Sequence, residues 1–178
     1  MLDSGDPLPL PAETLAMPTI RPLSQVPEAR AVCIRWCDAE WGAAARYSIT
    51  DWEAEFDRIE AHPVDEIFVA LEGTVPVGMA WMLEREGPRR LSHLTPWLSS
   101  LIVAPEHRDR GVARALIAHV EAYAATGGDE VLFLLTETPS VYFLSGWEVR
   151  DTAPTRNGDV FVMQKALEGY SAEPAGRR

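Results

Sequence analysis

The stretch Leu98-Ser99-Ser100-Leu101-Ile102-Val103-Ala104-Pro105-Glu106-His107-Arg108-Asp109-Arg110-Gly111-Val112-Ala113-Arg114-Ala115-Leu116 decides how this chain folds. An apolar run over 97–103 predicts a buried strand, and a charged loop then leads into an amphipathic helix expected over 111–126. The first turn of a helix has backbone N–H groups without an intrahelical partner, and such groups bind anions. The small residues of Arg108-x-x-Gly111-x-Ala113 let the backbone approach phosphate oxygens, and the arginines add positive charge. The stretch therefore predicts a site for a phosphorylated ligand.

A second motif follows a nearly continuous apolar run over 131–136, which predicts a central strand. It reads Tyr142-Phe143-Leu144-Ser145-Gly146-Trp147 and resembles the Tyr-x-x-x-Gly-aromatic signature of the GCN5-related N-acetyltransferases, the GNAT superfamily. The first stretch resembles the central acetyl-coenzyme A motif of the same family, and the resemblance extends over about 18–166. It implies an α/β (α+β) fold class, with a mixed, mostly antiparallel central sheet, helices on both sides, and a V-shaped splay between strands 98–103 and 131–136.

The resemblance implies that acetyl-CoA binds in this splay as the acyl donor, with its pantetheine amides paired to the backbone of Leu101 and Val103. A backbone N–H near Leu101 or Ile102 would stabilise the oxyanion, and N–H groups over 109–114 would hold the pyrophosphate. The expected cofactor-binding residues are Leu101, Ile102, Val103, Arg108, Asp109, Arg110, Gly111, Val112, Ala113 and Arg114.

The resemblance also implies the reaction, in which a primary amine of a small molecule or peptide attacks the thioester directly. Tyr142 matches the general acid that protonates the leaving thiolate. Many family members use a glutamate on the central strand as the base, but the run 97–102 contains no carboxylate. The base stays open among Glu84, His93, Glu137 and a water chain ordered by Ser99 and Ser100.

Acceptor recognition in this family involves the segment between the first two helices and the last hairpin. The candidates here are Trp41, Tyr47, Thr155 and Asn157, and Trp97 is a further candidate for an apolar or cation-binding wall.

Composition narrows the classes of function. The chain has 178 residues, 47% of them hydrophobic, which suits one domain with a full core and no second domain. The net charge of −11 argues against nucleic acid and favours cationic partners. Cys33 and Cys37, four residues apart, suit semi-buried thiols better than a disulfide or a metal site. Without a secretory signal or a membrane span in the sequence, we expect a cytoplasmic protein. We also expect that it binds no metal.

The ends of the chain differ in composition from the centre. We expect a disordered leader over 1–17, one domain over 18–167 and a disordered tail over 168–178, with Met17 as a candidate for the true start.

Local patterns predict the remaining elements. The helix signals include a capping box at Thr50-Asp51-Trp52-Glu53 that opens a helix ending at Ile59. The other expected elements are an edge strand over 18–23, a helix over 27–38, a hairpin over 66–71 and 77–83, a loop over 85–95, a short helix over 140–144, and a closing hairpin over 147–151 and 160–164 that turns at Asn157-Gly158.

Two other functions fit parts of the sequence. A non-catalytic acyl-CoA-binding or interaction module would keep the cofactor cleft without turnover, which agrees with the missing strand carboxylate and disagrees with Tyr142. A nucleotide-binding Rossmann domain is disfavoured because the arginine-glycine loop follows a long hairpin rather than the first strand of a βαβ unit. Family members are often dimers, so a homodimer is also expected as a possible assembly.

Overall fold

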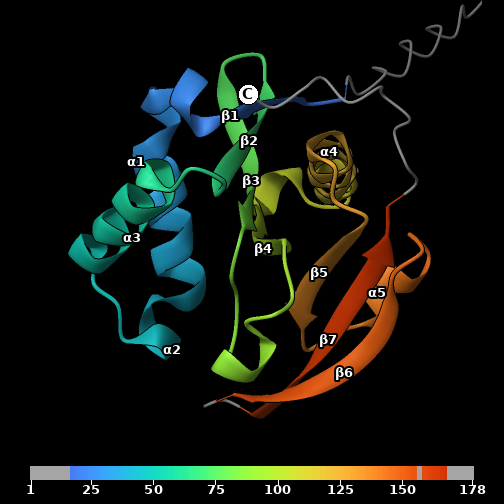
Figure 1. Cartoon of the computed structure of the whole chain (residues 1–178). Helices are drawn as coiled ribbons and strands as arrows, with labels where there is room; N and C mark the ends of the chain where they lie inside the picture. Colours follow the sequence, from blue (N-terminus) through green and yellow to red (C-terminus); the bar gives the residue numbers. More distant parts are fainter. Residues whose placement is uncertain (1–16, 156–157, 168–178) are drawn as a thin grey trace, which may run out of the picture.

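Seven strands form one sheet in the order β1-β2-β3-β4-β5-β7-β6 (Figure 1). The computed structural model describes residues 17–155 and 158–167, so Asn157, the expected tail and all of the expected leader except Met17 lie outside the described residues. Only the β4–β5 pair is parallel within that part of the chain. The strands are β1 (Thr19–Pro22), β2 (Glu66–Glu72), β3 (Val75–Leu83), β4 (Trp97–Val103), β5 (Val131–Thr136), β6 (Glu148–Thr155) and β7 (Gly158–Ala166). The mixed, mostly antiparallel sheet expected from the sequence is confirmed.

Helices cover both faces of the sheet, with α1 and α3 on one face and α4 on the other (Figure 1). Alternate residues of β2 therefore enter different cores: Ile67 and Val69 pack with α1 and α3, whereas Phe68 and Ala70 pack with α4. This double burial explains why the central strands read as continuous apolar runs. The helices are α1 (Arg30–Cys37), α2 (Ala43–Ala45), α3 (Ile49–Ala61), α4 (Val112–Gly127) and α5 (Ser140–Phe143), and a π-helical segment spans Asp38–Gly42.

Gly78 on β3 lets α4 approach the sheet closely. A Cβ at this position would lie 2.8 Å from the Ile102 carbonyl oxygen and 3.2 Å from side-chain atoms of Leu116 and Val112. Those two side chains belong to the first half of α4, so the glycine fixes how near the start of α4 lies to β4. The phosphate-binding loop predicted from the sequence is the segment that joins them.

The start of α3 differs from the prediction. Ser48 is the N-cap: its Oγ accepts a hydrogen bond from Asp51 N (3.3 Å), and Asp51 Oδ2 accepts one from Ser48 N (2.8 Å). The predicted box beginning at Thr50 was therefore wrong by two residues, and the helix continues to Ala61. Both tetrapeptides fit the capping pattern, and the extended backbone of Ser48 selects the first of them.

Other predicted elements agree with the structure within a few residues. The first predicted helix begins as a 3-10 turn over Pro27–Ala29, and the predicted loop over 85–95 contains a 3-10 turn over Arg89–Leu91. The π-helical segment and α2 were not predicted. Cys33 and Cys37 are fully buried free thiols, and burial raises the pKa of Cys33 to about 12. Among the described residues, no helix is at once long enough and apolar enough to cross a bilayer.

His119 on α4 makes the stability of the fold depend on pH. Its ring lies 4.8 Å from that of Phe68, and burial lowers its pKa below the ordinary value. The unfolded chain therefore binds a proton at higher pH than the folded chain does, and stability falls as pH drops through about 6.5. We expect the free energy of unfolding of the wild type, minus that of His119→Phe, to fall as pH drops from about 8 to about 5, measured by urea unfolding. A constant difference across this range would contradict the assignment.

Candidate active site

The parallel strands β4 and β5 meet at one end and then separate. Their register contains the single pair Trp97↔Phe133 among the described residues, supported by a hydrogen bond from Phe133 N to the Pro96 carbonyl oxygen (3.0 Å). Beyond Trp97, the edge of β4 that faces β5 pairs with no strand over residues 17–155 and 158–167, while its other edge stays paired to β3. The splay expected from the sequence is thus present, and it leaves backbone groups of β4 available to a ligand.

A β-bulge bends β4 at the point of separation. Met79 and Trp81 of β3 pair with Ile102 and Ser99, so the register shifts between them. Ser100 lies inside this bulge with a φ of 47°, a left-handed conformation that L-residues adopt at some cost. The bulge turns the strand away from β5, which opens the cleft between them.

A groove of about 600 Å³ runs from the start of α4 along β4 to α5. It is lined by His107, Ile117, Val141, Leu144 and Ser145 and by eight of the ten residues predicted to bind the cofactor: Leu101, Val103, Arg108, Asp109, Gly111, Val112, Ala113 and Arg114. No side chain caps α4 and no acidic residue lies in its first turn, so no side chain occupies its leading N–H groups, and the residues that carry them line the groove.

The two predicted cofactor residues outside this lining are Ile102 and Arg110. The side chain of Ile102 is buried in the core with α1 and α3. Arg110 points toward the end of β2, where its Nη1 lies 3.1 Å from His107 Nδ1 and 3.8 Å from Glu72 Oε1. Arg108 lies in the groove, and its Nε donates a hydrogen bond to the Val103 carbonyl oxygen (3.2 Å). Arg108 and Arg110 thus differ in their surroundings.

Tyr142 lies on α5 at the mouth of the cleft, with its ring 6.1 Å from that of Trp147. Trp147 is buried, and its Nε1 donates a hydrogen bond to Glu121 Oε1 on α4 (3.0 Å). The same carboxylate contacts Lys165 Nζ (2.6 Å) on β7. Trp147 therefore connects Tyr142 to α4 directly and, through Glu121, to β7. Burial raises the pKa of Tyr142 above its ordinary value. The phenol stays protonated at neutral pH.

A second cavity, of about 290 Å³, occupies the cleft between β4 and β5. It shares Leu101 with the groove, and Tyr142 lies in its wall. The remaining lining comes from Trp41, Glu86, Leu98, Ser99, Ser100, Leu134 and Leu135. The groove and the cleft cavity thus adjoin at the bulge of β4.

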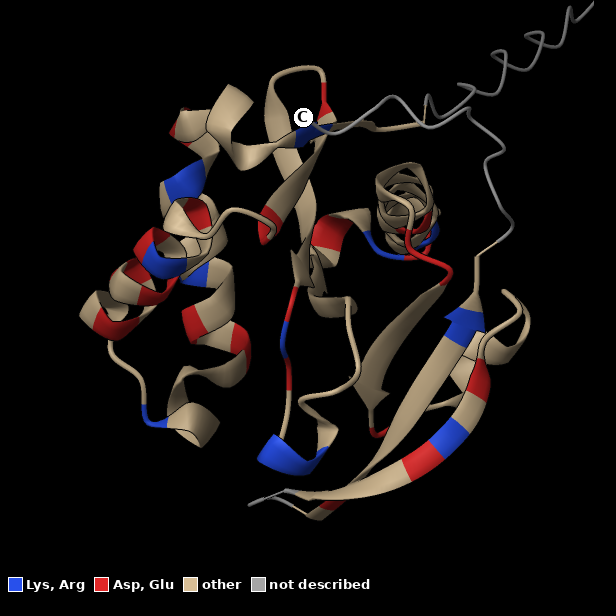
Figure 2. Ribbon diagram, in the orientation of Figure 1, with Lys and Arg blue, Asp and Glu red and all other residues tan. Residues whose placement is uncertain are grey.

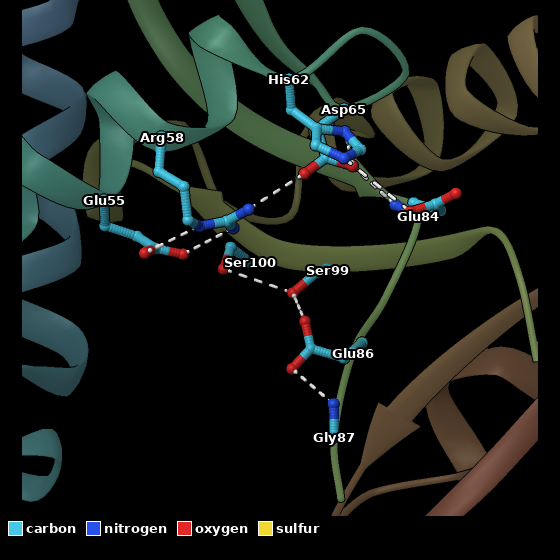
Figure 3. Close-up of polar contacts among 9 residues, drawn as sticks. All are labelled: Glu55, Arg58, His62, Asp65, Glu84, Glu86, Gly87, Ser99 and Ser100. Carbon is cyan, nitrogen blue, oxygen red and sulfur yellow. Dashed lines mark hydrogen bonds and ion pairs between the residues drawn. The ribbon is translucent and has the colours of Figure 1, made fainter. Parts of the chain in front are cut away.

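Glu86 is a cleft residue that the sequence reasoning missed (Figure 3). Ser99 Oγ donates a hydrogen bond to Glu86 Oε2 (2.7 Å), and Gly87 N donates one to Oε1 (3.3 Å). Ser100 Oγ lies 3.5 Å from Ser99 Oγ. Figure 2 shows the acidic, basic, acidic run over 84–86 where the chain leaves β3. The position of Glu86 between two central strands is the signal in the sequence that points to it, but the predicted loop over 85–95 gives no direction to its side chain.

The base candidates from the sequence lie elsewhere. Glu84 points away from the cleft toward His62, whose Nε2 is 3.8 Å from Glu84 Oε2 (Figure 3), and it lines a separate cavity of about 500 Å³ with Met82 and Tyr123. His93 and Glu137 are exposed and do not line the cleft cavity. Of the predicted set, only Ser99 and Ser100 reach the cavity.

The residues predicted to recognise the acceptor lie in different parts of the structure. Trp41, on the π-helical segment, lines the cleft cavity, whereas Tyr47 packs against Trp52 with ring centroids 5.0 Å apart. Trp97 is fully buried in a core with Phe133, so its predicted place in a substrate wall was wrong. Thr155 ends β6.

Comparisons with known proteins bear on this arrangement. The profile of the acetyltransferase (GNAT) family matches residues 31–144. No curated protein sequence matches the chain significantly.

Solved structures share the fold at low sequence identity. An aminoglycoside 6'-N-acetyltransferase complexed with coenzyme A has a TM-score of 0.69 at 15% identity, with 86% of this chain and 99% of that chain covered. A spermidine N-acetyltransferase chimera from Vibrio cholerae and hSSAT has a TM-score of 0.67 at 18% identity, with 85% and 96% covered. The structure of yncA from Salmonella typhimurium with its cofactor acetyl-CoA has a TM-score of 0.65 at 19% identity, with 90% of this chain and 100% of that chain covered.

Proposed function

The chain belongs to the acetyltransferase (GNAT) family, and from this premise we propose that it transfers the acetyl group of acetyl-CoA to a primary amine of a small molecule or peptide. The observation that carries the proposal is the junction of the groove and the cleft cavity at Leu101. A ligand with an anionic end and a reactive thioester end needs such a junction. The similar structures crystallised with coenzyme A or acetyl-CoA support this choice of donor.

The chain's own groups can perform each part of the binding. Uncapped N–H groups at the start of α4, with Arg108 beside them, suit a pyrophosphate. The unpaired edge of β4 suits the amides of an extended pantetheine arm, which would bind as an added strand does. A backbone N–H near Leu101 would stabilise the oxyanion that forms when the amine attacks the thioester carbonyl.

Tyr142 would act as the general acid in this reaction. It lines the cleft cavity beside Leu101, and its raised pKa keeps the phenolic proton available. As the carbon–sulfur bond breaks, the phenol would donate this proton to the thiolate, whose ordinary pKa lies below that of a phenol. Two proteins of similar structure are an aminoglycoside N-acetyltransferase and a spermidine N-acetyltransferase, and both names specify an amine acceptor. This supports an amine as the acceptor class here.

The test is calorimetric titration with acetyl-CoA, followed by thiol release measured across a panel of amines. The proposal expects binding together with thiol release that depends on the acceptor. Binding with only slow, acceptor-independent hydrolysis would favour the non-catalytic acyl-CoA-binding module instead. Absence of acetyl-CoA binding would overturn the proposed donor.

Arg108 and Arg110 provide a matched pair of variants. Arg108→Ala removes a cation from the groove, and we expect the Kd for acetyl-CoA to rise about tenfold, the equivalent of one charge-assisted hydrogen bond of about 1.5 kcal/mol. Arg110→Ala removes a side chain that points toward Glu72, so we expect a change of less than about threefold, because its backbone N–H remains. Calorimetry measures both values, and equal effects would contradict the distinction.

A further inference from the structure

The proposed reaction requires a group that removes a proton from the acceptor. An alkylamine has a pKa near 10 and is mostly protonated at neutral pH, where its nitrogen has no free electron pair for attack. β4 itself carries no carboxylate over Trp97–Val103. The residue that receives this proton must therefore come from another element that reaches the cleft.

Glu86 is the one carboxylate that lines the cleft cavity within the described part of the chain. It comes from the connection between β3 and β4 and lies in the cavity wall together with Tyr142 and Leu101. Its orientation is held at both oxygens, by Ser99 Oγ at 2.7 Å and by Gly87 N at 3.3 Å (Figure 3). A carboxylate fixed in this way can accept a proton with little rearrangement.

The charge around Glu86 favours a cation as its partner. Tyr142 is the other ionisable residue in the cavity lining, and it is neutral; no Lys, Arg or His belongs to that lining within 17–155 and 158–167. The carboxylate therefore has no cationic side chain that neutralises it in the cavity. A substrate ammonium group can fill this role, whereas a substrate with its own carboxylate near the amine would be repelled.

Trp41 adds an aromatic wall to the same cavity. It lies in the π-helical segment Asp38–Gly42. A π-helical turn contains an extra residue, so its side chains do not occupy the positions that they would have on a regular α-helix. Its indole is half-buried, with its ring centroid 6.4 Å from that of Trp52. An indole face attracts alkylammonium groups, which adds to the preference for cationic substrates.

We propose that Glu86 binds the ammonium group of a cationic alkylamine and accepts its proton, with Ser99 as the residue that positions the carboxylate. This inference rests on the proposed function. The ammonium nitrogen gives one proton to Glu86, which releases it to solvent, and the neutral nitrogen then forms a bond to the thioester carbonyl carbon. The carbon–sulfur bond breaks, Tyr142 protonates the sulfur, and the second nitrogen proton restores the phenol.

The experiment compares Glu86→Gln with Glu84→Gln, the neighbouring carboxylate outside the cleft. The readouts are kcat/KM for putrescine, spermidine, an aminoglycoside and glycine from about pH 6 to about pH 10, and the Kd for acetyl-CoA. In the wild type we expect kcat/KM for putrescine, spermidine or the aminoglycoside to exceed kcat/KM for glycine at least about tenfold. Glu86→Gln should lower kcat/KM for the best amine by about tenfold to a hundredfold near neutral pH. The loss should shrink toward pH 10, where the amine deprotonates in solution.

Three further results complete the test. Glu84→Gln should retain the wild-type profile, and the Kd for acetyl-CoA should be unchanged in both variants. Ser99→Ala should shift the pH profile in the same direction as Glu86→Gln, but less. The trimethylammonium analogue of the best amine, which has no proton to lose, should inhibit the wild type more strongly than Glu86→Gln.

The outcomes separate the two levels of inference. An active wild type with an unchanged pH profile in Glu86→Gln overturns the role of Glu86 and leaves the proposed function standing. An equal loss in Glu84→Gln also overturns it, as does a wild type that prefers glycine. A wild type that releases no thiol with any amine overturns the proposed function and, with it, this inference.

Discussion

Replacing Tyr142 with phenylalanine is expected to lower kcat at least about a hundredfold, because the leaving thiolate loses its proton donor. The Kd for acetyl-CoA should stay within about twofold, since the ring contact with Trp147 survives and a single hydroxyl is removed from the cavity wall. Steady-state thiol release at saturating substrate measures the first quantity and calorimetry the second. The separation of the two values identifies a role in the transition state rather than in binding.

The pH dependence of the wild type gives an independent check on Tyr142. Burial raises its pKa above the ordinary value near 10, so the protonated acid should persist throughout the range from about 6 to about 10. Activity should therefore show no decline on the alkaline side below about pH 10. Tyr123→Phe, which removes an exposed hydroxyl on α4 outside the cleft, is the matched control and should leave kcat unchanged. An unaltered kcat in Tyr142→Phe would remove the acid role.

The sheet and its helices were predictable because local patterns and the fold agree. The apolar runs of β4 and β5 indicate strands buried on both faces. In the structure, Leu98, Leu132 and Leu134 pack on the side of α4. On the opposite side, Ile102 packs with α1 and α3, whereas Trp97 and Phe133 pack with Leu91, Leu94 and residues of β6 and β7. The start of α4 was predictable from Pro105 and Gly111, which end a strand and open a helix. These features depend on a few consecutive residues, so the sequence alone contains them.

The position of the Glu86 side chain could not be predicted from local sequence. Glu84 and Glu86 differ by two positions and would share a face of an extended strand. β3 ends at Leu83, however, and the chain then leaves the sheet, so Glu84 turns toward His62 while Glu86 turns toward Ser99. Which carboxylate reaches the cleft depends on backbone angles in an irregular connection. No periodic pattern encodes these angles, and the same is true of the π-helical turn that carries Trp41.

For Trp97, the sequence predicts the strand correctly but not the environment of the side chain. An aromatic residue at the start of a strand beside the cleft can face either the ligand or the core. The structure buries it completely, with its Nε1 donating a hydrogen bond to the Leu94 carbonyl oxygen (2.8 Å) and its ring centroid 5.5 Å from that of Phe133. It also belongs to the one residue pair at which β4 and β5 meet among the described residues.

Replacing Trp97 with alanine is therefore expected to cost about 3–5 kcal/mol of unfolding free energy, the range found for truncating a large buried aromatic side chain. Urea unfolding followed by far-UV circular dichroism measures this loss. Trp97→Phe should cost less, because it keeps a ring against Phe133 and loses mainly the hydrogen bond to Leu94. Trp36→Ala, at a half-buried position on α1, should cost less than about 2 kcal/mol. If Trp97→Ala were as mild as Trp36→Ala, the closed end of the splay would not depend on this side chain. The large loss expected instead would show that the fold depends on the Trp97 side chain at the closed end of the splay, where β4 pairs with β5.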